Sequence, residues 1–175
     1  MKCKQIFALV FTLGLVLSLS SSAAAQSDSQ KSFDKLKTLA GSWEGSAHFG
    51  DKAMDGALMH VTLRVTSMGN TLMHEMKSDG PEDPITMITV DGDRLLLTHY
   101  CDAGNQPRML GTVSPDGKTV TFNFIDATNL QAAQGGHMQR ATFTFIDPDH
   151  HTEQWEFAMA DGKAMGGVID LRRSK

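Results

Sequence analysis

Residues 39–45 read Leu-Ala-Gly-Ser-Trp-Glu-Gly, the segment of the chain that is most informative about its fold. It joins the end of a short helix to a strand whose first large apolar residue, Trp43, stands between two glycines. From Trp43 to Phe49, apolar or small residues alternate with polar ones. Successive side chains of a β-strand point to opposite faces, so this alternation predicts a half-buried strand with Trp43 in the core.

The same period of two recurs along most of the chain. It is found at 61–66, 71–77, 120–124, 141–145 and 154–159, and a last strand near 167–172 would close the sheet. Turn pairs such as Asp91-Gly92 and Asp116-Gly117 separate several of these segments, as they do in hairpins. The sequence therefore predicts an all-β fold, an antiparallel meander that closes into a barrel of about eight to ten strands. A sandwich has similar strand spacing, but a closed barrel leaves no exposed sheet edge.

One short helix is predicted ahead of the first strand. Ser32 can cap it, and apolar residues recur at helical spacing from Phe33 to Leu39. Residues 26–31 contain no apolar side chain and are predicted to form a linker. Residues 32–175 then make a single domain, because about 150 residues are enough for one core and too few for two ordinary ones.

The first 25 residues have the pattern of an export signal. Lys2 and Lys4 give a positive start, 6–19 is an uncharged, largely apolar run, and small residues precede a cleavage point after Ala25. We therefore expect residues 1–25 to be a signal peptide and the mature protein to be periplasmic or secreted. The apolar run is shorter than the ~20 residues that a bilayer-spanning helix needs, so no membrane span is expected after cleavage.

Composition narrows the possible partners. Removal of the signal leaves 14 basic and 20 acidic residues, a net charge of −6. With no basic block and few aromatic residues to stack on bases, nucleic acid is not an expected partner. Cys101 is then the only cysteine, so no disulfide within the chain is expected.

Two resemblances can be stated on these residues. The 39–45 stretch looks like the Gly-x-Trp-x-Gly opening of calycin-type barrels, which include lipocalins, fatty-acid-binding proteins and the haem-binding nitrobindins. The segments 98–109, 126–130 and 136–138 resemble an uncharacterised group of exported bacterial lipocalin-like proteins. The resemblance implies a barrel that carries a ligand, with Trp43 packed at its closed end beside the helix. We count Trp43 among the candidate ligand-binding residues.

Haem binding in the manner of nitrobindins is not expected. Nitrobindin-type barrels hold the haem iron through a histidine in the strands near the C-terminus, and the segment after Trp155 contains no histidine. Ala47 also stands where their opening has its third glycine. No cofactor is therefore assigned, and haem or a transition metal is kept only as an alternative.

Segment 95–109 contains several side chains that can bind a ligand or a metal. If Leu95 and Leu97 face inward, His99 and Cys101 share their face; the opposite register would put Leu96, Thr98 and Tyr100 inside. We predict the first register. The pair would then be either ligands for haem or a metal, or a hydrogen-bonded core histidine beside a buried thiol, which is the interpretation we favour.

Other residues could complete a site around this pair. His74 shares parity with Leu72, and His137 falls in the long connection 126–139, so both could approach His99. Two candidate ligands fall short of the three or four that metal sites usually need. His150 and His151 follow Asp-Pro-Asp and are predicted to lie in a solvated turn.

Residues 102–108 form a predicted turn with two open interpretations. In the first, Asn105, Gln106 and Arg108 orient a polar or carboxylate head group at the barrel mouth, and Arg108 reaches the lumen if the parity of His99 carries across the turn. In the second, their side chains cap backbone groups and pair with acidic residues.

We therefore expect an exported binding protein for a small, largely apolar molecule held in the lumen. The candidate ligand-binding residues are His99, Cys101, Asn105, Gln106, Arg108, His137 and Trp43. The alternatives are a metal- or haem-dependent enzyme or redox protein that uses His99 and Cys101, and a structural envelope protein without a ligand. No recognised catalytic motif is present, so a non-enzymatic role is favoured.

Overall fold

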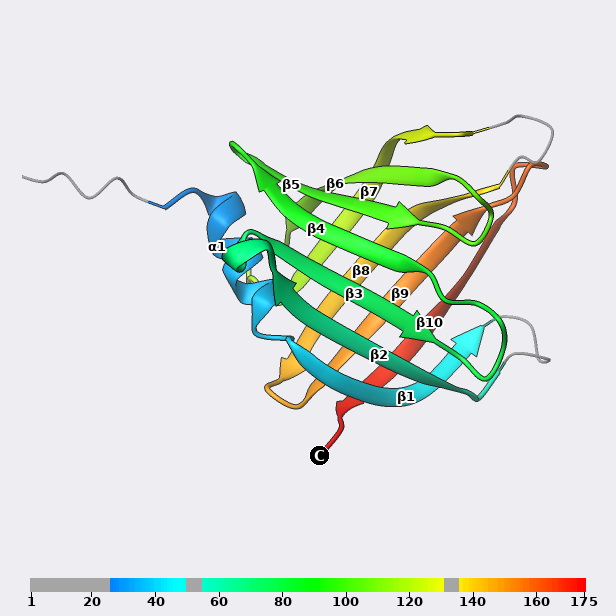
Figure 1. The fold of residues 1–175 in the computed structure, drawn as a ribbon, viewed down its shortest axis with the longest axis horizontal. Coiled ribbons are helices and arrows are strands. Elements are labelled where there is room, and N and C mark those ends of the chain that lie inside the picture. Colours follow the sequence, from blue (N-terminus) through cyan, green and yellow to red (C-terminus); the bar gives the residue numbers. More distant parts are fainter. Residues whose placement is uncertain (1–25, 50–54, 131–135) are drawn as a thin grey trace, which may run out of the picture.

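The computed structural model describes residues 26–49, 55–130 and 136–175, and within them ten antiparallel strands form a closed barrel (Figure 1). Each strand pairs with its neighbours in sequence, and β1 closes the barrel by pairing with β10. The predicted all-β barrel is thus confirmed. The predicted signal peptide, 1–25, lies outside the described residues.

The elements follow one another with short connections. Their bounds are α1 Asp28–Lys37, β1 Gly41–Phe49, β2 Ala57–Thr66, β3 Thr71–Lys77, β4 Ile85–Asp91, β5 Arg94–Tyr100, β6 Gln106–Val113, β7 Thr119–Thr128, β8 His137–Asp147, β9 His150–Ala158 and β10 Ala164–Arg173. A single turn of 3-10 helix at Ser67–Gly69 joins β2 to β3. No helix in the described ranges is both long and apolar enough to cross a membrane.

Helix α1 begins earlier than its predicted start at Ser32. Ser27 is the N-cap, and its side chain accepts a hydrogen bond from the backbone N–H of Gln30 at 3.2 Å. Most of the predicted linker, 26–31, is therefore the first turn of the helix. This difference arises because a capping serine and one polar turn can begin a helix without any apolar residue.

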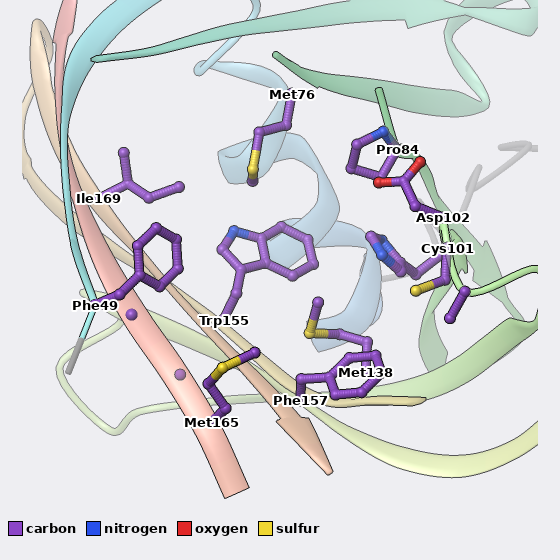
Figure 2. A pocket seen from close by; sticks show the side chains of 14 residues that line it. Phe49, Met76, Pro84, Cys101, Asp102, Met138, Trp155, Phe157, Met165 and Ile169 are labelled. Carbon is purple, nitrogen blue, oxygen red and sulfur yellow. The ribbon is translucent and has the colours of Figure 1, made fainter. Parts of the chain in front are cut away.

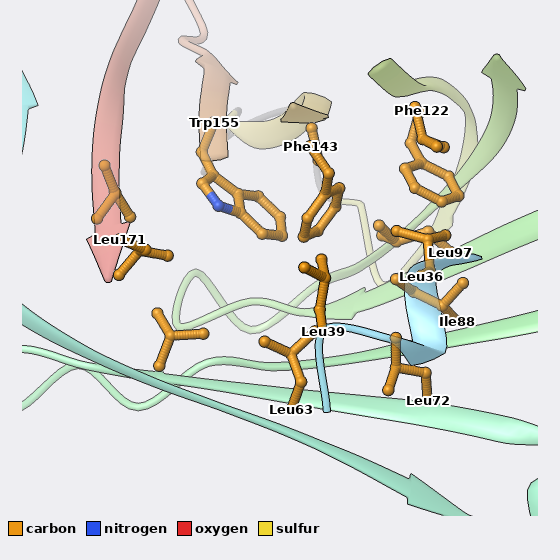
Figure 3. Packing of buried hydrophobic residues seen from close by; sticks show 14 of the residues in the cluster. Leu36, Leu39, Leu63, Leu72, Ile88, Leu97, Phe122, Phe143, Trp155 and Leu171 are labelled. Carbon is orange, nitrogen blue, oxygen red and sulfur yellow. The ribbon is translucent and has the colours of Figure 1, made fainter. Parts of the chain in front are cut away.

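The helix closes one end of the barrel. Phe33 and Leu36 on its inner face are buried, and the chain that follows adds Leu39. These side chains pack on the large apolar residues that the strands direct inward at this end, as Figure 3 shows for Leu63, Leu72, Ile88, Leu97, Phe122 and Phe143. The core is thus concentrated at the helix end, which leaves the opposite end of the barrel free to open.

The structure explains why the segment 39–45 contains its two glycines and its tryptophan. Gly41 has a φ of 139°, a conformation that other residues rarely adopt. The buried Trp43 donates its indole N–H to the carbonyl of Leu39 at 2.8 Å, and the Arg173 guanidinium lies 4.2 Å from the ring centroid. A Cβ on Gly45 would lie 1.7 Å from the Asp170 carbonyl oxygen, so β1 and β10 need a glycine there.

Candidate functional site

A cavity of about 360 Å³ lies at the open end of the barrel, opposite α1 (Figure 2). Its walls come from β1, β3, β5, β8, β9 and β10 and from the loops beside them. The lining residues are Phe49, Met76, Pro84, His99, Cys101, Asp102, Ala103, Met138, Trp155, Phe157, Met165, Gly166, Gly167 and Ile169.

The cavity wall is mostly carbon and sulfur. Three methionines and three aromatic side chains line it, and the Trp155 indole lies at its centre (Figure 2). Polar side chains in the wall are limited to His99, Cys101 and Asp102. Such a wall suits an apolar molecule with few polar groups.

His99 and Cys101 both line this cavity, which confirms the predicted register of β5. Leu95, Leu97 and His99 are buried, whereas Tyr100 is exposed. Leu95 and Leu97 point into the core at the helix end of the barrel, and His99, two residues further along β5, points to the same side. Histidine and thiol therefore lie on one wall.

His99 is a neutral group with one ring nitrogen engaged. Its Nδ1 lies 2.8 Å from Thr86 Oγ1, and its ring centroid is 5.4 Å from that of Trp155. Burial, with a smaller contribution from the charge of His74, lowers the pKa of His99 to about 4. Among the described residues, Nε2 has no hydrogen-bond partner, so it is the ring atom available to a ligand.

The Cys101 thiol is a free and weakly acidic group. In the part of the chain that the structure describes, it is a free cysteine. Burial raises its pKa, an effect to which Asp102 adds and which a backbone hydrogen bond at Ala103 partly offsets. The thiol therefore stays protonated at neutral pH, and the reactive thiolate is disfavoured.

Beneath the cavity a buried carboxylate fixes the Trp155 indole. Glu153 is fully buried and accepts hydrogen bonds from Trp155 Nε1 at 3.0 Å, His74 Nε2 at 2.9 Å and His151 Nε2 at 3.0 Å. Burial alone would raise the pKa of Glu153, but the His74 charge and the histidine donors outweigh it and hold the pKa well below its usual range. We call Glu153, His74, His151 and Trp155 the buried network.

The histidines of the buried network have only one partnered nitrogen each. The Nδ1 atoms of His74 and His151 are buried without a partner among the described residues. In the part of the chain that the structure describes, no three His, Cys, Asp or Glu side chains are arranged to hold a metal ion. Through the hydrogen bond from Trp155 to Glu153, the network supports the cavity floor.

The candidate histidines come together only in part. His74 and His99 approach Trp155 with centroid separations of 5.5 and 5.4 Å. His137, by contrast, begins β8 and packs on Phe124, with ring centroids 4.1 Å apart, and it does not line the cavity. Its predicted place in a long connection is wrong because β7 and β8 extend into 126–139 from both sides.

Arg108 does not reach the lumen. Its side chain is 53% exposed and forms a bidentate pair with Asp126, with Nε and Nη2 each 2.5 Å from a carboxylate oxygen. Pro107 and Met109 are the buried residues of this part of β6, and they share the odd parity of His99, so Arg108 between them points outward. The predicted head-group site at Arg108 is therefore not part of this cavity.

Asn105 and Gln106 also act within the protein. Asn105 is buried and donates its side-chain N–H to the Gly136 carbonyl at 2.8 Å, and Gln106 accepts a hydrogen bond from the Thr128 hydroxyl. Neither lines the cavity. The structural interpretation of this loop is the one that the contacts support.

Two further expectations need correction. Trp43 packs at the helix end as expected, with its indole held by Leu39 and Arg173, but it does not line the cavity and is therefore not one of its ligand-binding residues. His150 and His151 are buried, not solvated: they begin β9, and His151 shares the inward parity of Glu153 and Trp155.

Comparison with known proteins supports the fold. No family model matches the chain, and no curated protein matches it. Among solved structures, Rv2717c from M. tuberculosis has 16% identity and a TM-score of 0.56, with 82% of this chain and 98% of that chain covered. A DUF3598 family protein of unknown function from Nostoc punctiforme has 13% identity and a TM-score of 0.54. That match covers 79% of this chain, which spans about half (49%) of the Nostoc protein.

The burial of neutral His99 predicts a loss of stability in mild acid. Its pKa is about 4 in the folded protein and 6.5 in the unfolded chain, so the unfolded state binds more protons between these values. Stability is thus full above pH 6.5 and falls as the pH drops toward 4. We expect a loss of about 2–3 kcal/mol in the free energy of unfolding between pH ~7 and ~4.5.

Urea denaturation at several pH values measures this loss. The His99→Gln variant should show a much flatter pH dependence over the same range. His60→Gln changes an exposed histidine and is the matched control, which should follow the wild type. Equal slopes for wild type and His99→Gln would contradict the prediction.

Proposed function

We propose that this protein is an exported binding protein for a small, largely apolar molecule held in the cavity at the open end of the barrel. The observation that carries this proposal is the cavity itself, with an apolar wall at one end of a barrel whose other end is filled by the core. Its volume of about 360 Å³ is near the lower end of the range for small-molecule sites.

The residues of the wall support an adaptable site. Met76, Met138 and Met165 have flexible, polarisable side chains that adjust to different apolar shapes. Trp155 offers a flat surface that Glu153 holds in place through the indole N–H. A rigid indole at the base of the cavity and flexible methionines around it suit the binding of a compact apolar molecule.

The chemistry of the thiol supports binding over redox catalysis. A metal or redox role for His99 and Cys101 would use the thiolate, and the raised pKa of Cys101 opposes its formation. Export rests on the pattern of residues 1–25. N-terminal sequencing of protein isolated from cells tests it, since a mature start at Gln26 is expected.

An uncharged dye tests the binding site. We expect prodan, whose emission brightens in apolar surroundings, to bind the wild type at one site. Cys101→Phe places a large side chain in the cavity wall and should weaken prodan binding by about tenfold or more. Cys101→Ser keeps the size of the side chain and should bind almost as the wild type does.

The outcomes are distinct. Circular dichroism and urea denaturation confirm that both variants are folded. If prodan does not bind the wild type, or binds Cys101→Phe equally well, the cavity is not the binding site. If Cys101→Ser fails as fully as Cys101→Phe, the thiol itself is needed and the alternative role for Cys101 gains support.

A further inference from the structure

Acidic side chains gather at the mouth of the cavity. Asp102 lines the cavity directly, and the adjoining groove of about 350 Å³, which shares Phe49, Met76 and Pro84 with it, is lined by Asp79 and Glu82. We call Asp79, Glu82, Asp83 and Asp102 the acidic rim. Partial burial raises the pKa of Asp102, a backbone hydrogen bond from Asp83 lowers it, and the charges of Asp83 and Glu82 raise it further.

This negative charge has no balancing cation within the described residues. Among residues 26–49, 55–130 and 136–175, none of the four carboxylates forms an ion pair with Lys, Arg or His, and no Lys or Arg of these ranges lines either cavity. Other acidic residues do have a cationic partner, as Asp126 has in Arg108 and Asp161 in Lys163. The rim is therefore a place where a bound cation would relieve repulsion among like charges.

A second group in the cavity, His99, has one ring nitrogen without a partner among the described residues. His99 is 3% exposed, lines the cavity and uses only Nδ1 in its hydrogen bond with Thr86. When Nδ1 carries the proton, Nε2 presents a lone pair, which accepts a hydrogen bond from an N–H group. The polar wall thus offers acceptors and negative charge.

The aromatic wall has the same preference. The faces of Trp155, Phe49 and Phe157 carry negative partial charge, which attracts cations within about 6 Å of a ring centroid. An apolar wall that excludes water strengthens this attraction. A carboxylate, in contrast, would meet like charge at the rim, and the described residues of the wall include no Arg or Lys.

We infer that the cavity binds an apolar amine in its protonated form, with the hydrocarbon part against Trp155 and the methionines and the ammonium group at the acidic rim. This inference rests on the proposed function and names the class of its ligand. It replaces the carboxylate head group that the sequence suggested near Arg108, because that arginine is paired with Asp126 outside the cavity.

Three probes with the same chain separate the charge from the apolar part. Octylamine, octanol and octanoate are titrated into the wild-type protein by isothermal calorimetry at neutral pH, where the amine is cationic and the acid anionic. We expect octylamine to bind about tenfold or more tighter than octanoate, and also tighter than octanol. The preference for the amine should shrink in high salt, because the rim is solvent-exposed.

A rim variant locates the effect. Asp102→Asn removes one carboxylate at constant size and should weaken octylamine binding about threefold to tenfold while leaving octanol binding unchanged. Asp93→Asn makes the same change of charge in the β4–β5 turn, at the helix end of the barrel, and should bind all three probes as the wild type does.

Each result has one meaning. If octanoate or octanol binds as tightly as octylamine, or if Asp102→Asn and Asp93→Asn behave alike, the inference is wrong and the proposed function stands. If none of the three probes binds the folded wild type, the proposed function fails, and the inference fails with it.

Discussion

Glu153→Leu is expected to lower the free energy of unfolding by about 3–5 kcal/mol, the usual cost of breaking a buried charged pair by removing one partner. The Glu153 carboxylate accepts hydrogen bonds from two histidines and one tryptophan, all buried. A leucine accepts none of them, so three N–H groups would remain without partners inside the barrel. Urea denaturation measures the loss.

A neighbouring glutamate provides the control. Glu156 lies on the same strand with the opposite parity and pairs at 3.3 Å with Arg140 on the outer surface. Glu156→Leu should change the free energy of unfolding by less than about 1 kcal/mol, as is usual for an exposed pair. A Glu153→Leu protein as stable as Glu156→Leu would show that the buried network does not stabilise the fold.

Most of the fold could be predicted from the alternation of apolar and polar residues along the strands. The period of two from Trp43 to Phe49 and the register predicted for Leu95 to His99 both match the burial of those residues. It works because each strand of a barrel has one face in the core and one in solvent. Such a prediction uses the residues of one strand at a time, so it does not require knowledge of how neighbouring strands pair.

The position of Arg108 depends on the turn before it. Residues 101–105 form a turn and have no strand period, so the sequence leaves open whether the parity of β5 continues into β6. In the structure it does continue: Pro107 and Met109 keep the inward, odd parity of His99, and Arg108 is exposed. Arg108 pairs with Thr98 across the two strands, so the expectation that it enters the lumen is wrong.

The buried network was missed although its signal was present. His151, Glu153 and Trp155 alternate with Thr152 and Gln154, which is the same inward parity used elsewhere. The Asp-Pro-Asp turn before them and their polar character suggested solvent instead. Their burial is possible because each side chain supplies a partner for another, a fact that depends on His74 from a distant strand.

Trp43→Ala is the second large expected effect, also about 3–5 kcal/mol of the free energy of unfolding. The indole fills the helix end of the core, donates to Leu39 and supports the Arg173 guanidinium. Trp43→Phe keeps an aromatic ring and loses the N–H, so it should cost only about 1–2 kcal/mol. Similar losses for the two variants would mean that the ring adds little beyond its hydrogen bond.

Trp43 should also be coupled to the buried network through His151. The Trp43 and His151 rings meet edge to face with centroids 4.2 Å apart, and His151 Nε2 is bonded to Glu153. A double-mutant cycle of Trp43→Ala with Glu153→Leu should therefore deviate from additivity by about 0.5–3 kcal/mol. Because Glu153 also holds Trp155 under the cavity, this coupling would link the sealed end of the barrel to the floor of its open end. Additive losses would show that the two ends are stabilised independently.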